Sequence, residues 1–509
     1  MRLHLDTPLE GAAIRGAALH VQGWAYDENS PVRRVVVLVD GRPVARATLG
    51  WARPDVAERY ADPRMGLCGF DRVVTLPPEL RTPGPHTVAV RARLMDGRRR
   101  RTPEVRVDLP EDVLLPDEPV AAVRPATGAI IRSVWLARSL DRGGSQLRMA
   151  ETIDHLLRSG GWSVTVLSPV DGLLRERLER AGATVRLVDP VPFDDAAAYR
   201  VAVKGLADEL ADADLAVAFA VTSFPLVDAA RLAGVPAVQR IGESAPLPTV
   251  AAWLLGHLDP DVEARARRAV RGAAAIWTNS HAVERVYRRQ GYDGPWRVLH
   301  TGRPDVGNPP ARAEARRRLG IPSDRRLLVF AGTIWPVKGQ GLLAEAVRVV
   351  HEEVPDLMVA MVGYDGNAHA THLRDHVAAH DLADTVVVAP FHDDLGTWWA
   401  AADGVALTPT RQSEALSAAL VEGMAHGLPA LATLAGDADV MVEDGVSGWL
   451  AEPDDLDSLV DALRRAGAAD PATWRRYGEQ AALRCAREHD REGALVEAEA
   501  LLRESARTP

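Results

Sequence analysis

From residue 130 onward, short apolar runs alternate with longer segments of helical periodicity, and this alternation restricts the fold more than any other property of the chain. The apolar run 133–137 is followed by a helical pattern over 146–158 and by a second apolar run over 163–167. Strands that alternate with helices form βαβ units, which assemble into parallel sheets. A Pro-rich stretch at 303–310 divides the alternation into halves, so the sequence predicts two α/β, Rossmann-like domains.

The first hundred residues have a different pattern. They alternate apolar and polar over short runs, with Asp40-Gly41 and Asp96-Gly97 as hairpin turns. This pattern predicts a small all-β, Ig-like sandwich. The expected boundaries are 1–109 for the sandwich, 110–127 for a Pro-rich linker, 128–308 and 309–485 for the two Rossmann-like domains, and 486–509 for a C-terminal helix that packs back on the first of these.

Composition excludes several classes of protein. A chain of 509 residues with 47% apolar and 26% charged residues is long enough for about three globular domains. The net charge of −10 argues against a nucleic-acid binder. Without an apolar run of membrane-spanning length or a signal-peptide core at residues 1–10, we expect a cytoplasmic protein, with peripheral membrane contact as the alternative. Two distant cysteines, Cys68 and Cys485, predict neither a disulfide scaffold nor a zinc ribbon.

Glu414 and Glu422 stand at a predicted junction between a strand at 404–409 and a helix at 416–426. Eight residues at about 100° each place the two carboxylates about 80° apart, so we expect Glu414 in the loop and Glu422 on the helix. The N–H groups of a helix start attract phosphate, and carboxylates accept hydrogen bonds from sugar hydroxyls. The junction is therefore predicted to hold a sugar joined to a diphosphate.

Spacing alone does not carry this prediction. Glu345 and Glu353 have the same spacing inside a helical stretch, where both are ordinary helix positions. A second observation is the rarity of lysine, since Lys204 and Lys338 are the two in the sequence. Lys338 follows a predicted buried strand and Gly332, and an ammonium there can neutralise a diphosphate. A solvated surface loop is the alternative interpretation.

Gly143 and Gly144 follow the first strand of the first α/β half. Open parallel sheets bind ligands beyond the carboxyl ends of their strands. The pair lacks the Gly-x-Gly-x-x-Gly pattern of dinucleotide sites, so a nicotinamide oxidoreductase is not predicted. A tight turn without a ligand is the alternative.

Five ordered elements resemble the donor-binding domain of retaining GT-B glycosyltransferases of the large family four group. They are Gly332, Lys338 with Gly339, Glu414 with Glu422, residues 425–429 and residues 444–448. A weaker resemblance covers residues 130–308, where Gly143, Gly144 and Ser280 match.

The resemblance implies a role for each matching residue. Lys338 would hold the donor diphosphate, Glu422 the ribose hydroxyls and Glu414 the transferred sugar, with Lys338 and Glu414 as catalytic candidates. No cofactor and no protein-bound metal would be required, because the leaving diphosphate is stabilised electrostatically. The implied donor-side residues are Gly332, Thr333, Lys338, Glu414, Leu416, Ser417 and Glu422, and the implied acceptor-side residues are Gly143, Gly144, Arg240 and Glu243.

Three positions depart from the family pattern. Thr333 stands where many relatives have arginine, which leaves Lys338 with more of the diphosphate charge. Gly242 stands where many have histidine, so an acceptor-side role falls to Arg240 instead. Asp439 replaces a common glutamate, a change that we expect to be tolerated.

The N-terminal segment is similar to small β-sandwich modules attached to bacterial glycosyltransferases, through Gly23-Trp24, residues 53–56 and Gly69-Phe70. Trp24 and Trp51 are either sugar-stacking or core residues. Four arginines at 98–101 indicate either contact with an anionic surface or a solvated turn.

Together these features predict a glycosyltransferase that moves a sugar, with retention, from a nucleotide sugar to a glycan, lipid-linked or small-molecule acceptor. A nucleotide-sugar epimerase or sugar phosphorylase of the same fold, or a non-catalytic sugar-binding scaffold, remains the alternative.

Overall fold

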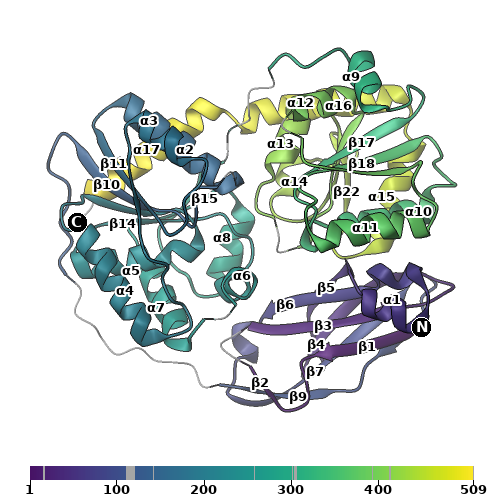
Figure 1. Ribbon diagram of the computed structural model, residues 1–509, viewed down its shortest axis with the longest axis horizontal. Coiled ribbons are helices and arrows are strands. Elements are labelled where there is room, and N and C mark those ends of the chain that lie inside the picture. Colours follow the sequence, from purple (N-terminus) through teal and green to yellow (C-terminus); the bar gives the residue numbers. More distant parts are fainter. Residues whose placement is uncertain are drawn as a thin grey trace.

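A computed structural model describes residues 1–14, 18–110, 121–141, 143–256, 258–300, 302, 307–392, 394–411 and 414–507. It contains an N-terminal β-unit (strands β1 to β9), a first α/β unit (β10 to β16) and a second α/β unit (β17 to β22), as shown in Figure 1. The two α/β units lie side by side, and the β-unit lies beneath the second and reaches the first.

The β-unit is built from mostly antiparallel strands. Its elements are β1 (Arg2–Thr7), β2 (Ala12–Ala13), β3 (Ala18–Tyr26), β4 (Val32–Val39), β5 (Arg42–Trp51), α1 (Pro54–Tyr60), η1 (Pro63–Leu67), β6 (Gly69–Thr75), η2 (Pro78–Leu80), β7 (Gly84–Leu94), β8 (Arg99–Arg101) and β9 (Val105–Leu109). The strands form one hydrogen-bonded path, β1-β3-β6-β5-β4-β7-β9-β2, with β8 on β7. An all-β region is thus confirmed, whereas an Ig-like sandwich of two separate sheets is not.

Two of the open interpretations in the β-unit are decided by packing. Trp24 is buried, and its ring packs between His4 and Tyr60, so it is a core residue. Arg98 forms ion pairs with Asp27 and Asp96 at 2.9 and 2.7 Å. These carboxylates offset the charge of Arg98, whereas Arg99–Arg101 form the exposed strand β8 on β7, so most of the arginine run is a strand and not the expected turn.

The first α/β unit has a seven-stranded parallel sheet in the order β12-β11-β10-β13-β14-β15-β16. Its elements are β10 (Ile131–Leu136), α2 (Gly144–Ser159), β11 (Trp162–Ser168), α3 (Arg175–Ala181), β12 (Thr184–Leu187), α4 (Ala196–Glu209), β13 (Leu215–Ala218), η3 (Val221–Ser223), α5 (Phe224–Ala233), β14 (Ala237–Ile241), α6 (Leu247–Leu254), α7 (Pro260–Arg271), β15 (Ala275–Thr278), α8 (His281–Arg288) and β16 (Trp296–Val298). The order reverses between β10 and β13, where Ser133 pairs with Leu215.

The second α/β unit has a six-stranded parallel sheet in the order β19-β18-β17-β20-β21-β22. Its elements are α9 (Arg312–Leu319), β17 (Arg326–Ala331), η4 (Pro336–Lys338), α10 (Gln340–Val350), β18 (Leu357–Val362), α11 (Ala368–Ala379), β19 (Val386–Ala389), α12 (Leu395–Ala401), β20 (Gly404–Leu407), α13 (Ala418–Ala425), β21 (Ala430–Thr433), α14 (Ala438–Met441), β22 (Gly448–Ala451), α15 (Leu456–Ala468) and α16 (Pro471–Glu488). The reversal falls between β17 and β20. Both sheets therefore have the doubly wound order, which places a ligand crevice at the reversal point.

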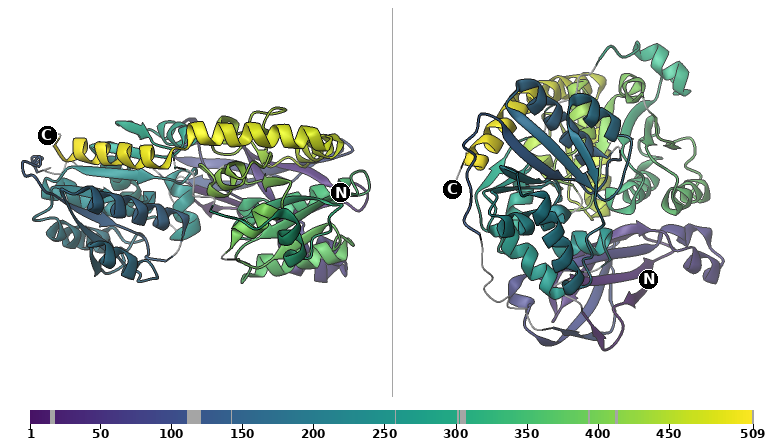
Figure 2. Two further views of the ribbon diagram at one scale, coloured as in Figure 1. Left: turned by 90° about the horizontal axis from the view of Figure 1, so that it is seen from above. Right: turned by 60° about the vertical axis from the view of Figure 1, so that its left-hand side comes forward.

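The last helix, α17 (Arg491–Arg507), leaves the second α/β unit and packs on the first, as Figure 2 shows from above. Leu501 and Leu502 join the core under β10 and β11. Arg503 donates to the carbonyl of Gly160 at 2.8 Å. The end of the described chain therefore ties the two α/β units together.

The β-unit contacts both α/β units. Arg33 and Arg34 donate to the buried carboxylate of Asp455, at the start of α15, at 3.1 and 3.0 Å. On the other side, the hydroxyls of Thr75 and Thr249 lie 2.7 Å apart, which joins β6 to α6. Of the expected linker, residues 111–120 lie outside the described residues. Within the described chain, none of the helices combines the length and the apolar composition that a membrane crossing requires.

Candidate functional site

Lys338 and Glu414 meet at the reversal point of the second sheet. Lys338 ends η4 in the connection after β17, and Glu414 lies in the connection after β20, the strand beside β17. Lys338 Nζ lies 2.7 Å from Glu414 Oε2, and the two side chains are 30% and 15% exposed. The structure thus joins two residues, 76 positions apart, that the sequence had assigned to one site.

The lysine loop is held in place by close packing against the end of β20. Gly339 has φ of +83°, and a Cβ at this position would lie 1.8 Å from the carbonyl oxygen of Thr408. A larger residue would therefore push the loop away from the sheet. The N–H of Thr410 donates to the carbonyl of Val337 at 3.0 Å, which links the lysine loop to the segment leading to Glu414.

Helix α13 is shorter than the sequence predicted. It spans Ala418–Ala425 instead of 416–426, because Ser417 is its N-cap and accepts a hydrogen bond from the N–H of Leu420 at 3.4 Å. The remaining N–H groups of the first turn have no acceptor within the helix. Leu416 is buried just before the cap, and residues 412 and 413 of the expected loop lie outside the described residues.

Glu422 lies on α13, as predicted, and is partly buried. Burial raises the pKa of its carboxyl above the usual value of 4.5, while the positive charge of Arg148 acts in the opposite direction. Arg148 belongs to α2 of the first α/β unit. A charge on the first α/β unit therefore acts on the carboxyl of Glu422. Thr333, in the loop after Gly332, accepts a hydrogen bond from Gln340 through its carbonyl and offers no charge.

On the first α/β unit, Gly143 is the N-cap of α2 and Gly144 its first residue, at the carboxyl end of β10. A Cβ at Gly143 would lie 2.4 Å from the side chain of Gln146, whereas one at Gly144 would meet nothing within 4 Å. A side chain at position 143 would displace the end of the Gln146 side chain, and there is open space beside Gly144.

Arg240 takes the space that a side chain at position 242 would occupy. A Cβ on Gly242 would lie 2.2 Å from Arg240 Nη1. The guanidinium lies over the ring of Phe219 at 4.9 Å and donates to the hydroxyl of Ser145 at 3.0 Å. Burial lowers the pKa of Arg240. The absence of a side chain at position 242 thus makes room for the guanidinium of Arg240.

Glu243 has a local structural task in this conformation. Its Oε2 accepts hydrogen bonds from the N–H groups of Val221 and Gly242 at 3.2 and 3.0 Å. These bonds fix the turn that follows β14. The predicted acceptor-side carboxylate is therefore engaged by the backbone on at least one oxygen.

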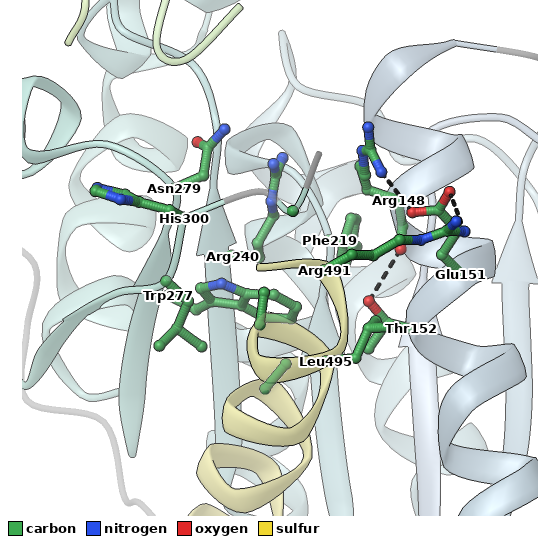
Figure 3. A pocket seen from close by; sticks show the side chains of 14 residues that line it. Arg148, Glu151, Thr152, Phe219, Arg240, Trp277, Asn279, His300, Arg491 and Leu495 are labelled. Carbon is green, nitrogen blue, oxygen red and sulfur yellow. Dashed lines mark hydrogen bonds and ion pairs between the residues drawn. The ribbon is translucent and has the colours of Figure 1, made fainter. Parts of the chain in front are cut away.

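A small basic pocket surrounds Arg240, and Figure 3 shows its lining. Arg148, His300 and Arg491 complete the basic groups, and Glu151 accepts from Arg148 and Arg491 at 2.6 and 3.2 Å. One carboxylate thus offsets part of the charge of three arginines. The cavity measures about 50 Å³, on the scale of one or two waters of about 30 Å³ each. Its size and charge suit a small anionic group.

Asp437 is a link between the α/β units that sequence reasoning missed. Its carboxylate accepts from the N–H groups of His281 and Ala282, at the start of α8, at 2.7 and 2.8 Å. Its own N–H donates to the carbonyl of Ala415, next to Glu414, at 2.9 Å. A carboxylate at a helix N-terminus stabilises the helix and, here, crosses from one unit to the other. The motif 436–439 was visible in the sequence, but its partner helix was not.

In the part of the chain that the structure describes, no three or more His, Cys, Asp or Glu side chains are grouped as metal ligands. On the proposed donor side, the charged groups in contact are the ammonium of Lys338 and the carboxylate of Glu414. This pair offers one cation for a diphosphate and one carboxylate for a hydroxyl.

Comparison with known proteins identifies a family pattern and the fold. Residues 325–468 match a family model described as glycosyl transferases group 1. The chain is 34% identical, over 220 residues, to D-inositol 3-phosphate glycosyltransferase of Streptomyces avermitilis, which covers 40% of this chain and 46% of that protein. The corresponding protein of Nocardiopsis dassonvillei is 31% identical over 49% of this chain and 60% of its own length. The chain thus spans about half the length of the curated relatives that it matches.

Among solved structures, Anabaena HepE in complex with UDP and glucose has a TM-score of 0.60 at 21% identity, over 73% of this chain and 99% of that one. WaaG, a glycosyltransferase involved in lipopolysaccharide biosynthesis, has a TM-score of 0.56 at 19% identity with the same coverage. These similarities establish the fold. The chain therefore carries the group 1 glycosyl transferase pattern in residues 325–468, on two α/β units that have the GT-B fold.

Proposed function

We propose that this protein transfers a sugar from a nucleotide-sugar donor to an acceptor. The observation that carries the proposal is the contact of Lys338 with Glu414 at the reversal point of the second sheet, within the segment that matches the family model. The relatives named above are glycosyltransferases, and the HepE structure contains UDP and glucose. These similarities support a nucleotide-sugar donor.

The donor side acts through charge. The ammonium of Lys338 is paired with Glu414 at 2.7 Å. A diphosphate that enters beside the first turn of α13 meets this ammonium and the free N–H groups of the turn. As the bond from the sugar to the diphosphate breaks, negative charge grows on the leaving oxygen, and both groups stabilise it. Glu414, released from the lysine, is then able to accept a hydrogen bond from a hydroxyl of the transferred sugar.

The acceptor side is assigned to the first α/β unit. Its basic pocket favours an acceptor with a small anionic group near Arg148 and Arg240. The name of the relatives includes inositol 3-phosphate, a phosphate ester of this kind. Retention of configuration, independence from metals and cofactors, and a cytoplasmic location with peripheral membrane contact as the alternative belong to the same proposal.

The test is a transfer assay with the full chain. Purified protein is incubated with UDP-, GDP- and ADP-sugars, with and without inositol 3-phosphate and other sugar phosphates, and released nucleoside diphosphate is measured. We expect release to rise when the right acceptor is added, the product to retain the anomeric configuration, and EDTA to leave the rate unchanged. Conversion of the donor sugar without an acceptor would instead show an epimerase, and dependence on inorganic phosphate a phosphorylase. Absence of binding to every nucleoside diphosphate in calorimetry would contradict the proposal.

A further inference from the structure

A second, larger cavity lies where the three units meet. It measures about 720 Å³, within the range of about 300–1,000 Å³ that is typical of small-molecule sites. Its walls come from β3, β5 and β6 of the β-unit, from α6 and α7 of the first α/β unit, and from the loop around η4 of the second. Figure 1 shows α6 beside β5 and β6 at this meeting point. We call it the junction cavity.

Three tryptophans line the junction cavity, one from each unit: Trp51, Trp253 and Trp335. Trp253 and Trp335 are 37% and 45% exposed, although burial of an indole is strongly favourable. Trp24, by contrast, is packed inside the β-unit and does not line this cavity. Partly exposed indole rings on two walls of a cavity suit a ligand with apolar ring faces and polar edges, as sugars have.

The polar groups of the cavity are hydrogen-bond acceptors and amides. The carboxylate of Asp71 lies within hydrogen-bonding distance of His20 Nε2, at 2.7 Å. Gln22 lies on the same strand as His20. Glu263, on the opposite wall, accepts from Arg267 at 2.8 Å. Among the described lining residues there is neither lysine nor arginine. Each of the two lining carboxylates is paired with a basic side chain, His20 or Arg267, so the described lining offers an anionic ligand less positive charge than the basic pocket around Arg240 does.

The junction cavity adjoins the donor-side loop. Trp335 and Val337 line it and directly precede Lys338 in the chain. The carbonyl of Val337 also accepts the N–H of Thr410, in the segment that leads to Glu414. An occupant of the cavity is therefore held next to the residues assigned to the donor, while its other contacts are made by the β-unit.

We propose that the junction cavity binds a neutral oligosaccharide, stacked on Trp253 and Trp335 and hydrogen-bonded by Asp71, His20 and Gln22. The β-unit then contributes one wall of a glycan site instead of serving only as a structural support. This inference goes beyond the transfer reaction proposed above, because the binding requires neither donor nor turnover.

Binding is measured on the full chain with neutral trisaccharides of glucose, mannose, galactose and N-acetylglucosamine, by tryptophan fluorescence and calorimetry. We expect at least one of them to bind, and Trp253→Ala to weaken that binding at least about fivefold, the loss of about 1 kcal/mol of ring stacking. Leu483→Ala, which removes an exposed apolar side chain from α16 outside the cavity, should leave the affinity unchanged. Lys338→Ala should also bind the sugar as the wild type does, which separates this site from the donor site.

A second variant tests whether trisaccharide binding needs the volume of the junction cavity. Ala252 lines the cavity on α6, so Ala252→Phe keeps every indole and fills part of the volume. We expect it to abolish trisaccharide binding and to retain UDP binding, with an unchanged melting temperature as the check on folding. Failure of every neutral trisaccharide to bind, binding that survives both Trp253→Ala and Ala252→Phe, or a preference for charged over neutral trisaccharides would overturn the proposal. If the wild-type protein binds a trisaccharide but transfers no sugar, only the transferase proposal is contradicted.

Discussion

The proposed donor side and the proposed acceptor side of this protein are built in different ways. On the second α/β unit, Lys338 and Glu414 each lie in the connection that follows one of two neighbouring strands, and one hydrogen-bonded sheet brings them together. On the first, the basic pocket combines Arg148 from α2, Arg240 from β14 and Arg491 from α17. The order of neighbouring strands brings the donor-side residues together, whereas packing between segments distant in the sequence brings the acceptor-side residues together.

This difference has a functional consequence. A site made by two adjacent loops keeps its geometry as long as its own sheet is intact. A pocket that includes a residue from α17 depends on the crossing of that helix from one unit to the other. We therefore expect variants on the donor side to change chemistry and variants on the acceptor side to change acceptor recognition, and four predictions test this separation.

The largest effect is expected from Lys338→Ala. It removes the cation that faces the diphosphate, and loss of one such group typically lowers turnover about 10² to 10³-fold. Steady-state release of nucleoside diphosphate measures the change. Lys204→Ala, at the other lysine of the sequence, is the matched control and should keep full activity. Similar rates in both variants would remove Lys338 from the mechanism.

Arg240→Ala should raise the acceptor KM about 10 to 100-fold, because a hydrogen bond to a charged group contributes about 1.5–3 kcal/mol. The dissociation constant of the nucleoside diphosphate should stay within about twofold. Gly242→Ala should give part of the same effect, since its Cβ displaces the guanidinium. A parallel loss of donor affinity in either variant would break the distinction between the two sides.

Glu422→Gln should weaken donor binding about tenfold, because it replaces a charged acceptor by a neutral one. In the wild type, burial raises the pKa of Glu422 above 4.5, so donor affinity should rise with pH through that raised pKa, and the variant should lose this dependence. The stability of the protein without donor should change with pH in the opposite direction. The folded state binds the proton more tightly than the unfolded state, so this group's stabilisation is present below pH 4.5 and is lost as the pH rises through the folded pKa.

Calorimetric titration of UDP between pH 4 and 8 and thermal unfolding over the same range measure both trends. Glu353→Ala is the control, since Glu353 has the same spacing from Glu345 but is paired with Arg464 on the surface. A pH profile that is identical in wild type and Glu422→Gln would assign the titration to another group.

The smallest effect is expected from Asp437→Ala, which removes the link between the units. Loss of a carboxylate that caps a helix start lowers the free energy of unfolding by about 0.5–2 kcal/mol. Because the carboxylate of Asp437 also holds the start of α8 against the second α/β unit, donor and acceptor constants should both worsen a few-fold. Chemical denaturation and the transfer assay measure the two effects. Asp439→Ala, two residues away and exposed, is the control, and an equal loss in both variants would argue against the link.

The residues proposed for the donor side could be named from the sequence because the evidence for them is local. The strand, the glycine, the single nearby lysine and the two glutamates each occupy one short stretch, and parallel strand order then places these stretches at one edge. The expected helix at 416–426 was two residues too long at its start, because Ser417 caps the helix instead of continuing it. Gly242 was visible in the sequence as a departure from the expected histidine, but only the structure shows that Arg240 fills the space.

Local patterns predicted the all-β region, the two α/β units with parallel sheets and the residues that we propose for the donor, since apolar periodicity and turn residues act over a few positions. Tertiary structure alone decided the rest. It brought Arg491 to Arg240, set Asp437 at the start of α8, and closed the junction cavity between three units. These contacts join segments that are tens to hundreds of residues apart, and their geometry follows from the packing of whole sheets and helices, which no local pattern encodes.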